Sequence, residues 1–111
     1  MSDAKAGLAA AKARLGGLAK ATPALMQAFS GISRVATSAG QFSAAQKELV
    51  AVAIAVSKGC EDCILYHLDG ARRHGADEAA LIEALEIAVE MGGGPAVMYA
   101  AKALDGWRNL G

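Results

Sequence analysis

Alanine and other aliphatic residues dominate this chain, and proline is almost absent from it. Hydrophobic residues make up 54% of the 111 positions, aromatic residues only 5%, and proline occurs twice. Alanine and leucine are among the best helix formers, whereas proline is the strongest helix breaker. The composition therefore favours helix over strand along the whole chain. We expect an all-α protein of about six helices.

Capping and turn residues divide the chain into six expected helical segments. Thr22-Pro23 is typical of an N-cap followed by proline in the first helical turn. Residues 43–46, Ser-Ala-Ala-Gln, form a capping box, and glycines at 59, 75 and 92–94 mark later boundaries. No linker or repeat interrupts these segments, so we expect one domain over residues 1–111. The expected helices cover about residues 4–18, 23–36, 43–57, 60–73, 78–91 and 96 onward.

The longest uninterrupted apolar run, Leu49 to Val56, lies in the third expected helix. Its β-branched residues could form a strand, but the capping box and the helical sequence on both sides favour helix. Because the run is apolar on every side, we expect this helix to be central and buried all round. The mean hydropathy of +0.30 is high for so small a chain. It predicts that other subunits cover part of the apolar surface.

Charge and hydropathy exclude several classes of function. Eleven basic and eleven acidic residues leave no net charge, and no basic cluster indicates nucleic-acid binding. The longest apolar run is far too short to span a membrane. The N-terminus lacks the continuous apolar core of a secretory signal. We therefore expect a cytoplasmic protein with reduced thiols, a setting in which paired cysteines are more often catalytic or metal-binding than structural.

The only two cysteines stand three residues apart, with a histidine one helical turn beyond them. In a helix, Cys60, Cys63 and His67 lie within about 60° of one another, at roughly 100° per residue. Thiol catalysis needs one sulfur to attack, another to resolve, and a base to form the thiolate. The helix N-terminus favours Cys60 as the attacking sulfur. Contact with His67 at i+4 favours Cys63 instead, so the residues alone leave this choice open.

Glu48 completes the candidate site. It shares a helical face with the apolar residues Val52 and Val56, so we expect its carboxylate to face the interior. A buried carboxylate needs a partner or a proton. His67 or a bound water is the natural partner, and with His67 the carboxylate of Glu48 would orient and charge the imidazole in a Glu–His–Cys relay.

Each member of this set also has an ordinary structural interpretation. Glu48 can lie at the exposed edge of its helix, His67 can be a core histidine, and the cysteines can be small buried residues. The same four side chains have the ligand types of a zinc site, but ligands at i, i+3 and i+7 converge poorly on a tetrahedral centre. We expect neither a metal nor a cofactor. Three nearby residues fall off the shared face and are interpreted as solvated or capping: Asp62, Tyr66 and Asp69.

The motif Glu48-x11-Cys60-x2-Cys63-x3-His67 resembles that of the AhpD-like alkylhydroperoxidases in the carboxymuconolactone decarboxylase family. The flanking sequence also fits, and the resemblance covers about residues 40–103. It implies an all-helical fold that assembles as homotrimers or homohexamers, with the CxxC helix near a subunit contact.

The resemblance also implies a peroxidase or disulfide reductase. Cys63 would attack a small hydroperoxide, Cys60 would resolve the sulfenic acid as a disulfide, and Glu48 and His67 would relay the proton. An unidentified thiol donor would reduce the pair again. The best-known members have a histidine at the position of Asp62, whose negative charge disfavours a neighbouring thiolate. The alternatives are a decarboxylase-type lyase that uses His67 and Glu48 without the cysteines, and a structural oligomer.

Overall fold

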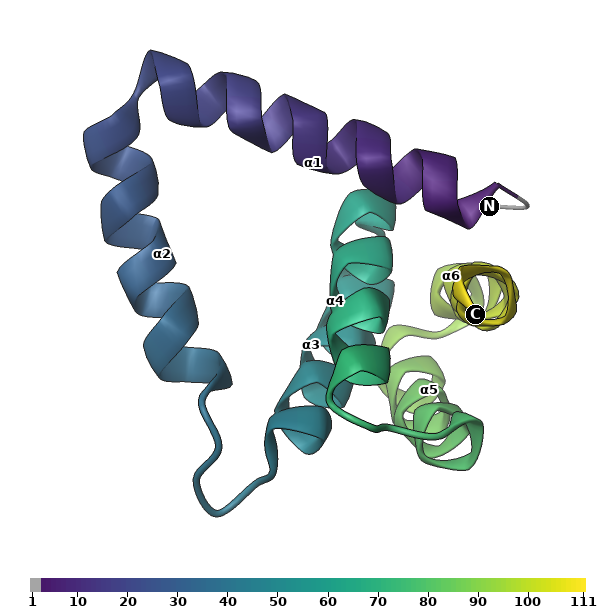
Figure 1. The fold of residues 1–111 in the computed structure, drawn as a ribbon. Coiled ribbons are helices and arrows are strands. Elements are labelled where there is room, and N and C mark those ends of the chain that lie inside the picture. The colour runs from purple at the N-terminus through teal and green to yellow at the C-terminus, as the bar shows by residue number, and fades with distance from the viewer. Residues whose placement is uncertain (1–2) are drawn as a thin grey trace.

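The computed structural model describes residues 3–111, which form six helices and no strand (Figure 1). This confirms the predicted all-α fold. Within the described residues, none of the helices combines the length and the apolar character needed to span a bilayer. The helices are α1 (Ala4–Ala21), α2 (Pro23–Thr37), α3 (Ala44–Lys58), α4 (Glu61–Arg73), α5 (Glu78–Gly92) and α6 (Gly94–Leu110).

The predicted helix boundaries are confirmed where a specific capping group sets them. Ser43 and Gln46 form a complete capping box at the start of α3. The Asp77 side chain accepts a hydrogen bond from the third residue of α5. Gly59 and Gly75 follow α3 and α4 with φ of 71° and 91°, the left-handed conformation that commonly ends a helix.

The first helix is longer than predicted. We expected Gly16-Gly17 to loosen its end near Leu18, but α1 continues to Ala21. A glycine inside a helix costs about 1 kcal/mol relative to alanine. The strong helix formers on both sides outweigh this cost, and the Thr22 N–H closes the last turn on the Leu18 carbonyl at 2.8 Å.

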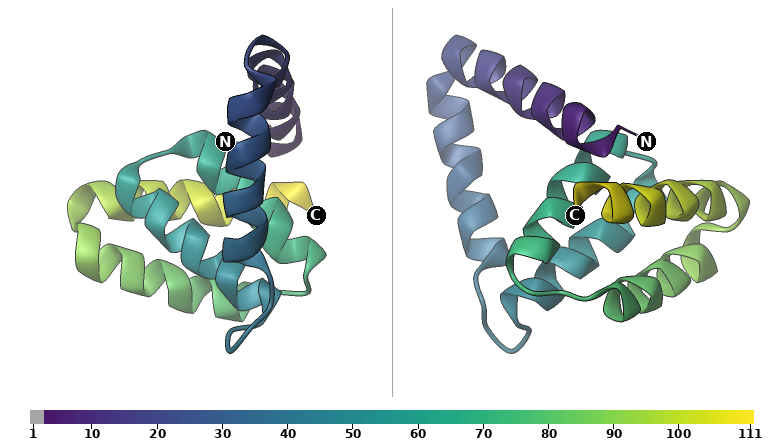
Figure 2. Two further views of the ribbon diagram at one scale, coloured as in Figure 1. Left: turned by 90° about the vertical axis from the view of Figure 1, so that its left-hand side faces the viewer. Right: turned by 45° about the vertical axis from the view of Figure 1, so that its right-hand side comes forward.

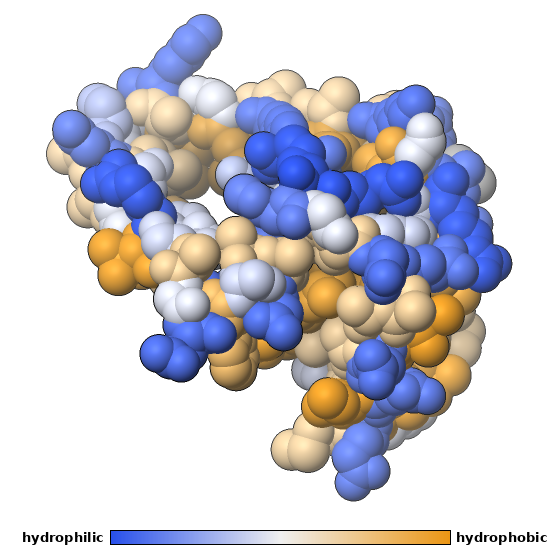
Figure 3. All heavy atoms as spheres, turned by 60° about the horizontal axis from the view of Figure 1, so that its bottom comes forward, coloured by the Kyte–Doolittle hydropathy of each residue, from blue (hydrophilic) through white to orange (hydrophobic). Residues whose placement is uncertain are grey.

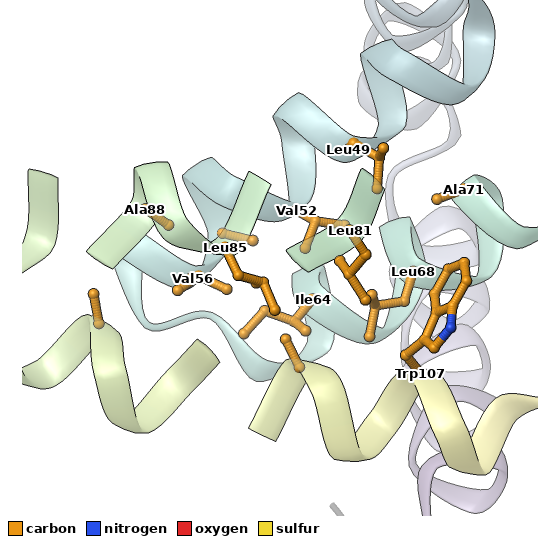
Figure 4. Packing of buried hydrophobic residues seen from close by; sticks show 13 residues of the cluster. Leu49, Val52, Val56, Ile64, Leu68, Ala71, Leu81, Leu85, Ala88 and Trp107 are labelled. Carbon is orange, nitrogen blue, oxygen red and sulfur yellow. The ribbon is translucent and has the colours of Figure 1, made fainter. Parts of the chain in front are cut away.

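One face each of α3, α4, α5 and α6 builds the main core (Figure 4). Trp107 of α6 lies at one end of it, where the Arg72 guanidinium stacks 4.5 Å from the ring centroid. Arg72 also donates a hydrogen bond to the Trp107 carbonyl, which joins α4 to the end of α6. The largest fully buried side chains are Ile64, Leu68, Leu81, Val52 and Val56.

The expectation that α3 is buried all round is wrong. Val52 and Val56 are buried, but Val50 and Ile54, on the opposite side of the helix, are 44% and 52% exposed. The reason is that α4, α5 and α6 pack against the side of α3 that carries Val52 and Val56 and leave the opposite side open. Hydrophobic residues consequently reach the surface of the single chain, as Figure 3 shows for one face of the molecule.

α1 and α2 extend from the core as an arm (Figures 1 and 2). Ala4 and Leu8 anchor the first part of α1 by packing against Leu65 of α4. Further along α1, Arg14 forms an ion pair with Asp62 at the start of α4. α2 packs only against α1 and α3 and contains no buried residue. α1 therefore holds α2 apart from α4, and the candidate site lies between these three helices.

Candidate functional site

The turn between α3 and α4 positions the two cysteines. Gly59 ends α3 in the left-handed conformation, and a β-carbon there would lie 3.1 Å from the ring of Tyr99 on α6. Both the backbone and the available space therefore require glycine. Cys60 follows as the N-cap of α4, and its sulfur accepts a hydrogen bond from the Cys63 N–H at 3.2 Å. Both sulfurs thus lie at the N-terminus of α4.

Cys60 and Cys63 form a disulfide, with their Cα atoms 5.2 Å apart. The two residues are not equivalent in their surroundings. Cys63 is exposed, whereas Cys60 is half-buried between the end of α3 and the start of α4. Of the two residues, Cys63 is the more exposed, and it also lines the pocket described below.

Of the two partners predicted for Glu48, His67 and a bound water, the structure shows His67. His67 Nδ1 lies 2.8 Å from Glu48 Oε2. Glu48 is only 7% exposed, which excludes the interpretation that it sits at an open helix edge. The buried carboxylate has the polar partner that burial demands. Because Nδ1 is engaged, Nε2 is the ring nitrogen that remains for proton transfer.

Gly70 of α4 makes room for the Glu48 carboxylate. A β-carbon at Gly70 would lie 2.5 Å from Oε2 and 2.8 Å from Cδ of Glu48, closer than real β-carbons come to other atoms. Any larger residue must displace Glu48 or separate α3 from α4. Spacing along the chain does not distinguish Gly70 from an ordinary helical glycine, so its role was not predicted.

A pocket of about 740 Å³ lies between α1, α2 and α4. Cys63 and His67 are part of its α4 wall, together with Asp62 and Tyr66. The last two were interpreted as lying away from the site, yet both line it, and the Tyr66 ring makes an edge contact with that of His67. Cys60 and Glu48 are not part of the lining. The arm supplies the rest of the lining: Ala11, Arg14, Leu15 and Leu18 from α1, and Met26, Phe29, Ser30, Ser33, Arg34 and Thr37 from α2.

Arg14 places a positive charge beside the acidic residue that precedes Cys63. Its guanidinium lies 2.8 Å from Asp62 Oδ2, and both side chains are more than half exposed. An exposed pair contributes only about 0–1 kcal/mol to stability. Its local effect is to reduce the repulsion that Asp62 exerts on a thiolate at Cys63. Because Arg14 is 48 residues from Asp62 in sequence, no local pattern predicted this contact.

The zinc-site alternative has no support in the part of the chain that the structure describes. Among residues 3–111, no group of three or more histidine, cysteine or carboxylate side chains is arranged to hold a metal ion.

The sequence of this chain matches a known family model and two curated proteins. Residues 23–106, from the start of α2 into α6, match the model of the carboxymuconolactone decarboxylase family. The chain is 50% identical to an uncharacterized protein of Cupriavidus necator over 103 residues, which cover 93% of this chain and 91% of the relative. It is 39% identical to uncharacterized protein 4 in the cox locus of Paracoccus denitrificans over 94 residues, covering 85% of each.

A solved structure is also similar to this one over almost its whole length. It is the crystal structure of the apo form of a carboxymuconolactone decarboxylase family protein from Legionella pneumophila. The two share 36% sequence identity and a TM-score of 0.92, and the superposition covers 97% of this chain and 96% of the other. The similarity therefore includes the arm as well as the core.

Proposed function

This chain belongs to the carboxymuconolactone decarboxylase family, and we propose that it is a thiol-dependent peroxidase or disulfide reductase that acts on small hydroperoxides. The observation that carries the proposal is the Cys60–Cys63 disulfide, whose Cys63 lines a pocket together with His67. The carboxylate of Glu48 forms a hydrogen bond with Nδ1 of that histidine. A lyase that uses only an acid and a base has no need of a redox pair.

In the first step, the reduced Cys63 attacks the hydroperoxide. His67 Nε2 takes the thiol proton, and the resulting thiolate bonds to one peroxide oxygen while the O–O bond breaks. The leaving alkoxide takes a proton from His67 and departs as an alcohol, and Cys63 becomes a sulfenic acid. Glu48 orients the imidazole through Nδ1 and stabilises its charged form during the transfer.

In the second step, Cys60 resolves the sulfenic acid. Its thiolate attacks the Cys63 sulfur, the S–O bond breaks, and the hydroxide leaves as water after protonation. The hydrogen bond from the Cys63 N–H and the N-terminus of α4 stabilise negative charge on the Cys60 sulfur.

A dithiol donor then restores the reduced pair. Its thiolate attacks the exposed Cys63 sulfur, forms a mixed disulfide and expels Cys60 as a thiolate. The second donor thiol releases Cys63, so the donor leaves as a disulfide and two electrons reach the protein. The hydrogen bond and the helix N-terminus that stabilise a thiolate at Cys60 also make the Cys60 sulfur a good leaving group in this step.

Intact-mass analysis after a small excess of tert-butyl hydroperoxide tests the proposal. We expect the reduced wild type to lose two hydrogen atoms, Cys60→Ser to gain one oxygen at position 63, and Cys63→Ser to stay unchanged. Peroxide consumption that persists undiminished in Cys63→Ser would refute the proposal. Lactone turnover by the variant lacking both cysteines would instead establish the alternative lyase that uses His67 and Glu48.

We also propose that the protein acts as a homo-oligomer, a trimer or a hexamer. Ile32 and Val35 of α2 do not line the pocket and are 66% and 76% exposed. α3 adds exposed apolar residues at Val50 and Ile54. A second copy of the chain is the partner that the high mean hydropathy and the family resemblance both favour.

A further inference from the structure

The geometry points to the substrate class of the proposed peroxidase: a hydroperoxide on an apolar chain that ends in a carboxylate, which Arg34 binds. This inference rests on the proposed function and deepens it. It follows from three properties of the pocket, namely its size, its apolar walls and its one unpaired guanidinium.

The pocket is much larger than a small peroxide requires. Its volume of about 740 Å³ lies within the range of ~300–1,000 Å³ that is typical of sites for drug-sized ligands. Apolar side chains from all three helices line it, among them Leu18 of α1, Phe29 of α2 and Tyr66 of α4. Leu18 and Phe29 are about half exposed to water in the single chain. An apolar ligand chain would remove this surface from water, which is the favourable term in apolar binding.

The charges that line the pocket do not balance. Asp62 is paired with Arg14 at 2.8 Å. The guanidinium of Arg34 makes no hydrogen bond or ion pair with any other residue of the described chain. Apart from His67, which is paired with Glu48, the lining therefore carries one uncompensated positive charge. A guanidinium binds a carboxylate through two parallel hydrogen bonds, and Ser30, one turn earlier on the same helix, adds a hydroxyl donor.

The two ends of the pocket set the length of the ligand. α2 begins where it meets α1 and runs away from it (Figure 1), and Arg34 lies in its last turn. Cys63, in contrast, lies in the first turn of α4, where Arg14 of α1 contacts Asp62. Along α2, Arg34 lies eight positions after Met26, which corresponds to a rise of about 12 Å. Because Cys63 and Arg34 lie on different helices and at different ends of them, a ligand that reaches both carries its peroxide and its carboxylate apart from each other on an extended chain.

The test compares a medium-chain hydroperoxy fatty acid with its methyl ester, which differs from it only in charge. We expect wild type to prefer the acid in kcat/KM and Arg34→Gln to reduce the acid-to-ester ratio by about tenfold, as for a lost hydrogen bond to a charged group. Arg73→Gln is the matched control, because Arg73 is an exposed arginine outside the pocket that pairs with Asp69. It should leave the ratio unchanged. An equal ratio in wild type and Arg34→Gln would overturn the inference.

Binding to the oxidised protein separates this inference from the proposed function. Calorimetry with decanoate and decanol does not depend on turnover. We expect decanoate to bind more tightly than decanol, and Arg34→Gln to weaken decanoate binding about tenfold. Equal affinity of wild type and Arg34→Gln for decanoate would overturn the inference even if small hydroperoxides are reduced. Failure of the reduced protein to consume any hydroperoxide, with decanoate still bound through Arg34, would overturn only the peroxidase function.

Discussion

Replacement of Gly70 by alanine tests whether the packing of α3 against α4 holds the proton relay in place. The new β-carbon would lie 2.5 Å from Glu48 Oε2, whereas ordinary contacts begin at 3.4 Å, so the two must separate by about 0.9 Å. The Glu48–His67 hydrogen bond is 2.8 Å long. A displacement of that size directed away from His67 breaks it, because a separation near 3.7 Å is no longer a hydrogen bond.

The expected loss in Gly70→Ala is larger in activity than in stability. Overpacking costs about 1–3 kcal/mol, and the higher helix propensity of alanine returns about 1 kcal/mol. We therefore expect a net destabilisation of about 0–2 kcal/mol in urea denaturation. A positioned general base contributes about 10²–10⁴ to a rate. Loss of its orienting partner should lower kcat/KM for tert-butyl hydroperoxide by about 10- to 100-fold.

Gly16→Ala is the matched control, because a β-carbon there meets no atom within 4 Å. It should stabilise the protein by up to about 1 kcal/mol and leave the peroxidase rate unchanged. A Gly70→Ala variant with the stability and rate of Gly16→Ala would refute the packing argument. If Gly70→Ala lowers activity by displacing Glu48, it should have little further effect in a protein that already carries Glu48→Ala. An equal loss of activity in the Glu48→Ala protein and in wild type would refute the relay.

Three further predictions concern the charges and the exposed apolar face. Arg14→Gln leaves the charge of Asp62 without its partner, so the second-order rate constant for the reaction with peroxide should fall about two- to fivefold. A further Asp62→Asn change should restore the rate constant, and no recovery would show that the charge of Asp62 does not cause the loss. Hydrogen bonding from the Arg108 guanidinium lowers the pKa of Glu78 below its ordinary value of 4.5. The resulting stabilisation is present at neutral pH and is lost as the pH falls through the lowered pKa, so thermal denaturation should show Glu78→Gln less stable than wild type at pH 7 and equal to it in strong acid. Ile32→Glu with Val35→Glu should reduce the mass measured by light scattering, and a monomeric wild type would contradict the oligomer.

Local information in the sequence determined the helices and the core of the candidate site. Caps such as Ser43 and Asp77 act on backbone groups within one turn, so their effect is readable from spacing alone. The placement of Cys63 and His67 on one face depends only on the helical period. Glu48 was identified because a charge among apolar residues needs a partner, and the structure provides His67 at 2.8 Å.

Tertiary structure alone decided which distant residues meet. Arg14 reaches Asp62 because α1 packs on α4, and Gly70 faces Glu48 because α4 packs on α3. The pocket and its unpaired Arg34 exist because the arm holds α2 away from α4. The exposure of Ile54 was mispredicted for the same reason. A pattern within one helix shows that a face is apolar, but which apolar face is covered depends on where the other helices pack, and that is a property of the folded chain.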